Sequence, residues 1–273
     1  MPRIHIKNLL ILIIIIFNLN FNKRIINFIC KSDLISQNPK ISVIIPIYNG
    51  GKYLNYSLKS VQNQTMKDIE IIIIDDNSKD DSLDIIKNYM KTDKRIRLIN
   101  NKENRKILFS KSLAALNSKG KYIIEIDQDD MIINNDAFNF IYNESEKYTL
   151  DLLHFKHISG IKIKNATNIF NNISNDNTVE TQPELKFTLF KKHKLYLWGN
   201  LIRADLYKKI IYNLWPIIIN YEITFQEDFL ILFFLLIYAK RFKSIKNIFY
   251  YYFKHENEVS RGYKSNSYFS DSL

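Results

Sequence analysis

Cysteine is almost absent from this sequence. Cys30 is the only one among 273 residues, so the chain can form no internal disulfide and no cysteine-based zinc site. A metal ion bound by this chain would therefore need oxygen ligands. No internal repeat is visible, and the length suits one substantial core built from two unequal halves.

A concentrated basic patch is also missing, although the formal net charge is +11. Isoleucine, asparagine and lysine are abundant throughout the chain, even in loops such as Asn134-Asn135 and Asn171-Asn172. A global bias of this kind argues against a selected surface for nucleic acid. We therefore expect no nucleic-acid partner.

The N-terminal region holds an apolar segment that is too short for a robust membrane span. Leu9 to Phe21 would rise only about 20 Å as a helix, against a hydrocarbon core of roughly 30 Å. The segment fits a signal sequence or an uncleaved signal anchor, and a tail of a cytosolic protein is the alternative. We expect residues 1–40 to direct the protein to a membrane or the secretory pathway (ER or Golgi in a eukaryotic host), with a cytoplasmic location as the alternative.

From residue 41 onward, apolar runs alternate with helical segments. We expect strands at 41–45, 70–74, 95–99 and 121–126, and helices at 53–62, 82–90 and 108–116. Strands that are apolar throughout suit a parallel sheet that is buried on both faces. The alternation therefore predicts an α/β fold with a mostly parallel, doubly wound sheet flanked by helices.

The second half of the sequence is less regular. Residues 136–183 are rich in asparagine and predict a variable, loop-rich region, whereas order returns with Leu185 to Phe190, Leu197 to Ile211 and an apolar helix from Phe229 to Ala239. The predicted organisation is thus an N-terminal segment (1–40), a first half (41–135), a variable region (136–183) and a second half (184–273).

Carboxylates follow two of the predicted strands directly. Asp75-Asp76 comes after Ile74, and Asp127-Gln128-Asp129-Asp130 comes after Ile126. Ligands of parallel sheets bind beyond the carboxyl ends of the strands, so a metal and nucleotide site is plausible at this edge. A solvated acidic turn is the alternative reading. A third acidic pair, Glu227-Asp228, begins the last apolar helix, where it would also satisfy the helix dipole.

Four segments, taken in order and spacing, resemble the motifs of family 2 glycosyltransferases with the GT-A fold. They are Ile41 to Asn49, Ile74 to Ser78, Ile126 to Asp130 and Gln226 to Asp228. The resemblance is strong over residues 41–135 and looser over 195–255. It implies that 41–135 is the donor-binding half and that 184–273 is the acceptor-side half with the catalytic base. It implies an inverting, metal-dependent enzyme that moves one sugar from a nucleotide-diphosphate sugar, such as a UDP-sugar, to a hydroxyl of a glycan, lipid-linked or protein acceptor.

The resemblance assigns the donor pocket to four residues. Tyr48 is expected to pack against the nucleobase, with Pro46 beside it, and Asp76 to accept a hydrogen bond from the base. Lys111 stands where the family commonly has the arginine of an Ala-Arg-Asn element, and it could bring positive charge to a phosphate. The glycine usual a few positions earlier is replaced by Arg105-Lys106.

The resemblance also assigns the metal site and the base. Asp127, Asp129 and Asp130 are expected to hold Mn²⁺ or Mg²⁺, with Asp130 as the direct ligand and Asp129 as a ribose or metal contact. Asp228 is expected to be the general base that deprotonates the acceptor hydroxyl. Glu227 is either a second participant or a structural acid.

Several alternatives stay open. Trp198 either stacks on an acceptor sugar or belongs to the core, and His255 is either an additional metal ligand or a structural residue. The sequence lacks a Gln-x-x-Arg-Trp element and a set of C-terminal membrane spans, which favours single transfer over processive synthesis. A catalytically inactive GT-A domain that binds nucleotide-sugars or glycans is the rival function.

Overall fold

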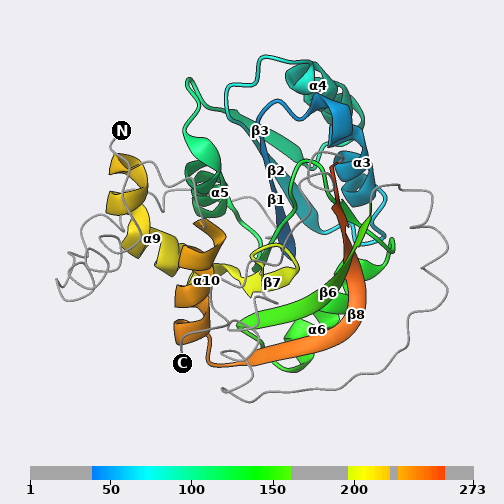
Figure 1. Ribbon diagram of the computed structural model, residues 1–273. Coiled ribbons are helices and arrows are strands. Elements are labelled where there is room, and N and C mark those ends of the chain that lie inside the picture. The colour runs from blue at the N-terminus through cyan, green and yellow to red at the C-terminus, as the bar shows by residue number, and fades with distance from the viewer. Residues whose placement is uncertain (1–38, 161–195, 222–226, 256–273) are drawn as a thin grey trace, which may run out of the picture.

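The computed structural model describes residues 39–160, 196–221 and 227–255 (Figure 1). Its strands form one eight-stranded sheet in the order β3-β2-β1-β4-β7-β6-β8-β5. The strands are β1 (Ile41–Ile47), β2 (Ile69–Asp75), β3 (Ile96–Asn100), β4 (Tyr122–Glu125), β5 (Met131–Ile132), β6 (Leu152–Gly160), β7 (Asn200–Arg203) and β8 (Phe242–Phe253). The helices are α3 (Gly51–Gln62), α4 (Ser82–Thr92), α5 (Lys106–Asn117), α6 (Ala137–Lys147), α9 (Ala204–Asn220) and α10 (Glu227–Tyr238).

The first half of the sheet is parallel, as the sequence predicts. Strand β1 pairs in parallel with β2 and β4, and β2 pairs in parallel with β3. Because these strands point the same way, the carboxyl ends of β1, β2 and β4 meet at one edge of the sheet. That edge carries the predicted site residues.

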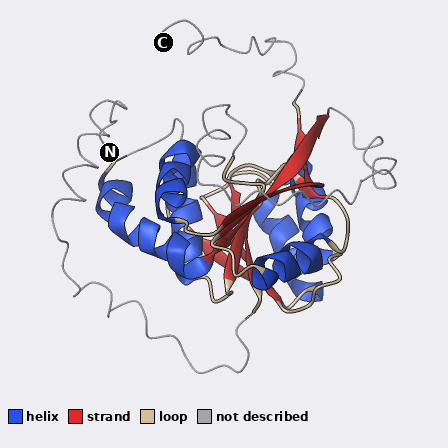
Figure 2. Ribbon diagram, turned by 90° about the horizontal axis from the view of Figure 1, so that it is seen from below, coloured by secondary structure: helices blue, strands red, loops and turns tan. Residues whose placement is uncertain are grey.

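Helices cover both faces of the sheet, which explains the uninterrupted apolar runs (Figure 2). Alternate residues of β1 pack into two separate cores: Val43 and Ile45 belong to the core under α3, α4 and α6, whereas Ile44 belongs to the core under α5, α9 and α10. Every side chain of β1 is therefore buried, whichever face of the sheet it lies on. The α/β fold class is confirmed.

The loop-rich prediction for residues 136–183 is wrong for its first part. Residues 137–160 form helix α6 and the nine-residue strand β6, while 161–195 lie outside the described residues. In α6, Ala137, Phe138 and Ile141 are buried at helical spacing, although polar residues fill the exposed positions. The abundance of asparagine hid this amphipathic pattern.

The second half of the sheet is mixed. Strand β7 is antiparallel to both β4 and β6, and it leads directly into α9, which contains Pro216 near its end. Strand β8 is parallel to β6 and antiparallel to β5. The pairing of β8 with β5 places residues 250 and 251 next to the loop that follows β4. Within the described ranges, no helix is both long and apolar enough to cross a bilayer; the segment Leu9 to Phe21 lies outside them.

Candidate active site

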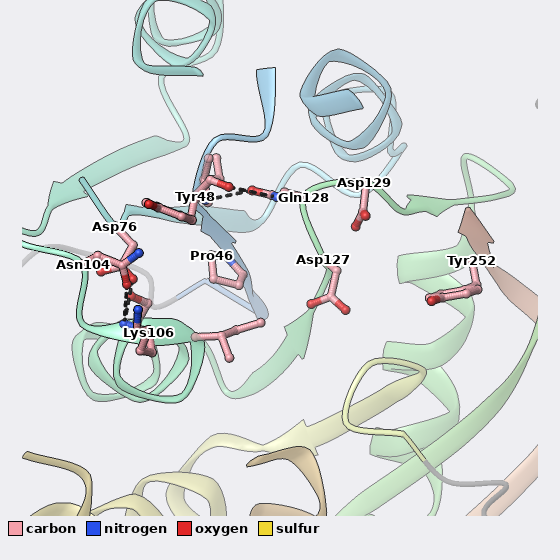
Figure 3. A pocket seen from close by; sticks show the side chains of 12 residues that line it. Pro46, Tyr48, Asp76, Asn104, Lys106, Asp127, Gln128, Asp129 and Tyr252 are labelled. Carbon is pink, nitrogen blue, oxygen red and sulfur yellow. Dashed lines mark hydrogen bonds between the residues drawn. The ribbon is translucent and has the colours of Figure 1, made fainter. Parts of the chain in front are cut away.

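A cavity of about 530 Å³ opens at the carboxyl ends of β1, β2 and β4 (Figure 3). Five of the predicted site residues line it: Pro46, Tyr48, Asp76, Asp127 and Asp129. They come from the ends of three strands that are far apart in the sequence. The sheet topology thus brings them together as the acidic strand ends predict.

Asp76 joins the end of β2 to the start of α5. Its carboxylate accepts hydrogen bonds from the backbone N–H groups of Arg105 (2.9 Å) and Lys106 (2.8 Å) and from the side-chain amide of Asn101 (2.7 Å). The two backbone donors lie at the N-terminal end of a helix, where a negative charge is favourable. Asp76 is therefore held rigidly at the cavity wall.

Lys106 occupies a conformation that glycine adopts more easily. Its φ angle is +70°, in the left-handed region, which costs a residue with a Cβ roughly 1–2 kcal/mol. The chain therefore takes up a conformation that favours glycine without having one at this position. Lys106 keeps the turn and adds a long basic side chain to the cavity lining.

Tyr48 is fixed by a side chain that the sequence did not single out. The Gln128 side-chain amide accepts a hydrogen bond from Tyr48 N–H (2.8 Å) and donates one to Tyr48 C=O (3.2 Å), as Figure 3 shows. The Tyr48 ring itself is 45% exposed. A Cβ added to Gly50 would lie 2.5 Å from the Gln128 Oε1 atom, so a larger residue at position 50 would displace the Gln128 side chain. Gln128 thus positions the loop after β1.

The first two carboxylates of the Asp127-Gln128-Asp129-Asp130 loop reach the cavity. Asp127 Oδ1 is buried and lacks a hydrogen-bond partner within the described part of the chain. Burial raises the pKa of Asp127, and the nearby Lys111 opposes this effect. Asp129 Oδ2 lies 2.6 Å from His255 Nε2, and the His255 ring packs edge-on against Tyr53. The structure therefore places His255 beside Asp129.

Asp130 points into the protein instead of the cavity. It is fully buried, and its two oxygens accept hydrogen bonds from the Tyr250 hydroxyl (2.8 Å) and the Phe253 N–H (2.9 Å). Burial, followed by the charges of Asp127 and Asp129, raises the pKa of Asp130 to about 8. The geometry therefore does not fit the prediction of Asp130 as the direct metal ligand. Asp130 connects the loop to β8.

Lys111 also differs from its predicted role, because it does not line the cavity. Its side chain is buried, and its Nζ atom lies 3.0 Å from Asp228 Oδ1 and 3.5 Å from both Glu125 Oε2 and Asp127 Oδ1. A lysine surrounded by three carboxylates is drawn away from a phosphate. Its ammonium group connects Asp127, in the loop after β4, to Asp228 at the start of α10.

Glu125 is the second residue that sequence reasoning missed. It lies in β4, is fully buried, and accepts a hydrogen bond from the Tyr207 hydroxyl of α9. Burial raises the pKa of Glu125 to about 7, although the charge of Lys111 opposes the shift. The signal in the sequence was a single charged residue inside an otherwise apolar strand, Tyr122-Ile123-Ile124-Glu125-Ile126.

Asp228 lies at the start of α10 and remains 26% exposed. The side chain of Glu227 lies outside the described residues.

Trp198 is buried and stacks between Tyr196 (4.4 Å between ring centroids) and Tyr250 (4.6 Å), so it belongs to the core. Tyr196, by contrast, is 38% exposed.

The donor set of the cavity suits a hard divalent ion that is shared with a ligand. No group of three or more metal-ligating side chains forms a protein-only metal centre in the described ranges. Mg²⁺ and similar ions are commonly bound by one or two carboxylates together with substrate phosphates. Asp127 and Asp129, which both line the cavity, provide two such carboxylates.

Comparison with known proteins agrees with this architecture. The model of glycosyl transferase family 2 matches residues 42–149. The glycosyltransferase GlyA of Streptococcus pneumoniae is 30% identical over 189 residues, which cover 64% of this chain and 26% of GlyA. Residues 42–149 therefore belong to glycosyl transferase family 2. A further relative is GalNAc(5)-diNAcBac-PP-undecaprenol beta-1,3-glucosyltransferase of Campylobacter jejuni, 33% identical over 111 residues, which cover 40% of this chain and 36% of that enzyme.

The fold is also found among solved structures. Residues 1–349 of TarS from Staphylococcus aureus, crystallised with UDP-GlcNAc, superpose with a TM-score of 0.64 at 21% identity, covering 80% of this chain and 59% of the TarS chain. The fold is therefore the GT-A fold predicted from the motifs. The chain spans only part of the length of each of these proteins.

Proposed function

We propose that this chain transfers a sugar from a nucleotide-diphosphate sugar to an acceptor hydroxyl. The observation that carries the proposal is the convergence of Tyr48, Asp76, Asp127 and Asp129 on one cavity, with Asp228 connected to that cavity through Lys111. The family membership and a fold neighbour crystallised with UDP-GlcNAc support a UDP-sugar as the donor.

The residues of the cavity have separate roles in binding this donor. The exposed Tyr48 ring is available to stack on the nucleobase, since Gln128 holds its backbone in place. Asp76 is rigid and acidic, so it suits a hydrogen bond from the base N–H. Pro46 and Lys106 complete the wall, and Lys106 is a better candidate than Lys111 for contact with a phosphate because it lines the cavity.

Asp127 and Asp129 would hold Mn²⁺ or Mg²⁺ together with the diphosphate. Such an ion neutralises the diphosphate and makes it a better leaving group. Asp129 takes the role of direct ligand that the sequence had suggested for Asp130, because both oxygens of Asp130 are bound to β8. His255 lies within 2.6 Å of Asp129 and orients its carboxylate.

Asp228 would act as the general base. Its partial exposure lets an acceptor hydroxyl approach, and the hydrogen bond from Lys111 Nζ (3.0 Å) holds its carboxylate at the start of α10. The deprotonated oxygen would attack the anomeric carbon from the face opposite the nucleotide, so that the configuration inverts. One sugar would be added in each encounter.

The acceptor is proposed as a glycan, lipid-linked or protein hydroxyl. A lipid-linked acceptor is supported by the undecaprenol-linked substrate that the name of the Campylobacter jejuni relative gives. Attachment to a membrane through Leu9 to Phe21 would place the enzyme near such an acceptor.

Nucleotide release tests this function. The purified chain is incubated with a panel of UDP-, GDP- and dTDP-sugars, with and without Mn²⁺, and the released nucleotide is measured. We expect metal-dependent release from at least one donor and a loss of about 10²–10⁴-fold in rate for Asp228→Asn. A chain that binds nucleotide but releases none from any donor would instead support an inactive binding domain.

A further inference from the structure

The buried Lys111 connects three carboxylates that come from three different parts of the chain. Its Nζ atom lies 3.0 Å from Asp228 at the start of α10, 3.5 Å from Asp127 at the cavity, and 3.5 Å from Glu125 in β4. The lysine side chain is only 2% exposed, so the geometry of these contacts is set by packing. Lys111 therefore links the donor side of the site to the proposed base.

Glu125 is fixed from behind by a second helix. One of its oxygens accepts a hydrogen bond from the Tyr207 hydroxyl of α9, and the other faces Lys111. Neither Glu125 nor Tyr207 lines the cavity, and both are fully buried. Tyr207, Glu125, Lys111 and Asp228 thus form a continuous chain of polar contacts from α9 to α10.

Stability alone gives little reason for this arrangement. A buried ion pair loses much of its attraction to desolvation, and apolar side chains of similar volume often stabilise a protein equally well or better. Asp228, by contrast, has a functional need for a partner. It lies at the end of a helix with a partly exposed side chain, and the hydrogen bond from Lys111 to Asp228 Oδ1 restricts its rotation.

We propose that Glu125 and Tyr207 are positioning residues for sugar transfer: they hold the Lys111 ammonium group in place, and Lys111 orients the Asp228 carboxylate toward the acceptor. The inference rests on the proposed function, because it needs Asp228 as the base. It differs from a role in donor binding. Loss of Glu125 or Tyr207 should slow the reaction step and leave the affinity for the nucleotide nearly unchanged.

Two nearly isosteric variants test the proposal. Glu125→Gln and Tyr207→Phe are compared with the unaltered chain for kcat and KM of nucleotide release from the preferred donor, and for UDP affinity by calorimetry. Misplacement of a catalytic group can cost about 100-fold, so we expect kcat to fall by roughly 10- to 100-fold. UDP affinity should stay within about 3-fold.

A double-mutant cycle distinguishes positioning from a general loss of structure. If Glu125 acts through Asp228, Glu125→Gln should have almost no further effect on kcat when Asp228→Asn is already present, because the two changes then remove the same function. Each variant is first checked by thermal unfolding. If Glu125→Gln does not fold, Tyr207→Phe tests the same connection.

The chain offers a matched control in a second buried lysine. Lys243 is 1% exposed and is paired with Glu144 in α6, outside the cavity. Glu144→Gln removes the carboxylate partner of a buried lysine there and should leave kcat unchanged.

Two results would contradict the positioning role. These are a kcat loss for Glu144→Gln as large as that for Glu125→Gln, and a further full loss for Glu125→Gln in the Asp228→Asn background. An unaltered chain that releases no nucleotide from any donor would refute the proposed function itself, and the positioning role with it.

Discussion

The hydroxyl of Tyr250 connects strand β8 to the acidic loop of residues 127–130, and removing it tests how strongly this contact stabilises the fold. It donates to Asp130 Oδ2 (2.8 Å) and accepts from the N–H of Asp127 (3.2 Å). Tyr250 is fully buried, so water cannot replace these bonds. Tyr250→Phe removes one oxygen atom and keeps the ring, including its stacking on Trp198 at 4.6 Å.

The expected magnitude follows from the two groups that the substitution leaves without a partner. A buried donor or acceptor that loses its hydrogen bond costs about 1–3 kcal/mol. Asp130 Oδ2 and the Asp127 N–H are both affected, so Tyr250→Phe should lower the free energy of unfolding by roughly 2–6 kcal/mol. Removal of a hydroxyl at an exposed position should cost less than about 0.5 kcal/mol.

Urea unfolding, followed by circular dichroism, measures this difference. Tyr56→Phe is the control, because Tyr56 is 47% exposed. We expect a lower midpoint for Tyr250→Phe with an unchanged slope, and no shift for Tyr56→Phe. Equal midpoints for the two variants would refute the conclusion that β8 holds the loop through Tyr250.

Two further predictions concern the Tyr48 loop and the acid stability of the fold. Gln128→Ala removes both hydrogen bonds to the Tyr48 backbone, so UDP affinity measured by calorimetry should fall about 10-fold, whereas an unchanged affinity would show that the loop needs no such support. Burial lowers the pKa of His154 from 6.5 to about 4, with its ring beside Asn200. The unfolded chain therefore takes up this proton first as pH falls from 6.5 toward 4, and the free energy of unfolding should drop by about 3 kcal/mol in that window. His154→Gln should remove most of this pH dependence in urea titrations at pH 7 and pH 4.5, and an equal dependence in both proteins would contradict the assignment.

The sequence predicted the parallel half of the fold well, because burial on both faces leaves a strong local pattern. The strands around Ile44 and Ile72 are rich in isoleucine and buried at nearly every position, and the carboxylates that follow β2 and β4 mark the ligand edge. Helix α6 and strand β6 were missed because polar residues on their exposed sides obscured the pattern.

The individual roles in the site were harder to predict, since they depend on contacts between distant residues. Asp129 and Asp130 are neighbours in the sequence, but Asp130 is turned inward by Tyr250, which lies 120 residues further along the chain. Lys111 is turned toward Asp228, 117 residues away. No local sequence pattern predicts the orientation of Asp130 or Lys111, because it depends on contacts with β8 and α10.

Calorimetric titration with UDP, in the presence and absence of Mn²⁺, tests the central claim about the site most directly. The unaltered chain, Asp129→Asn and Asp130→Asn are compared at a temperature where all three are folded. We expect Mn²⁺ to strengthen UDP binding to the unaltered chain and to Asp130→Asn, and to have little effect on Asp129→Asn. If Mn²⁺ strengthens binding equally in Asp129→Asn, or if only Asp130→Asn loses the metal effect, the assignment of the donor site is wrong.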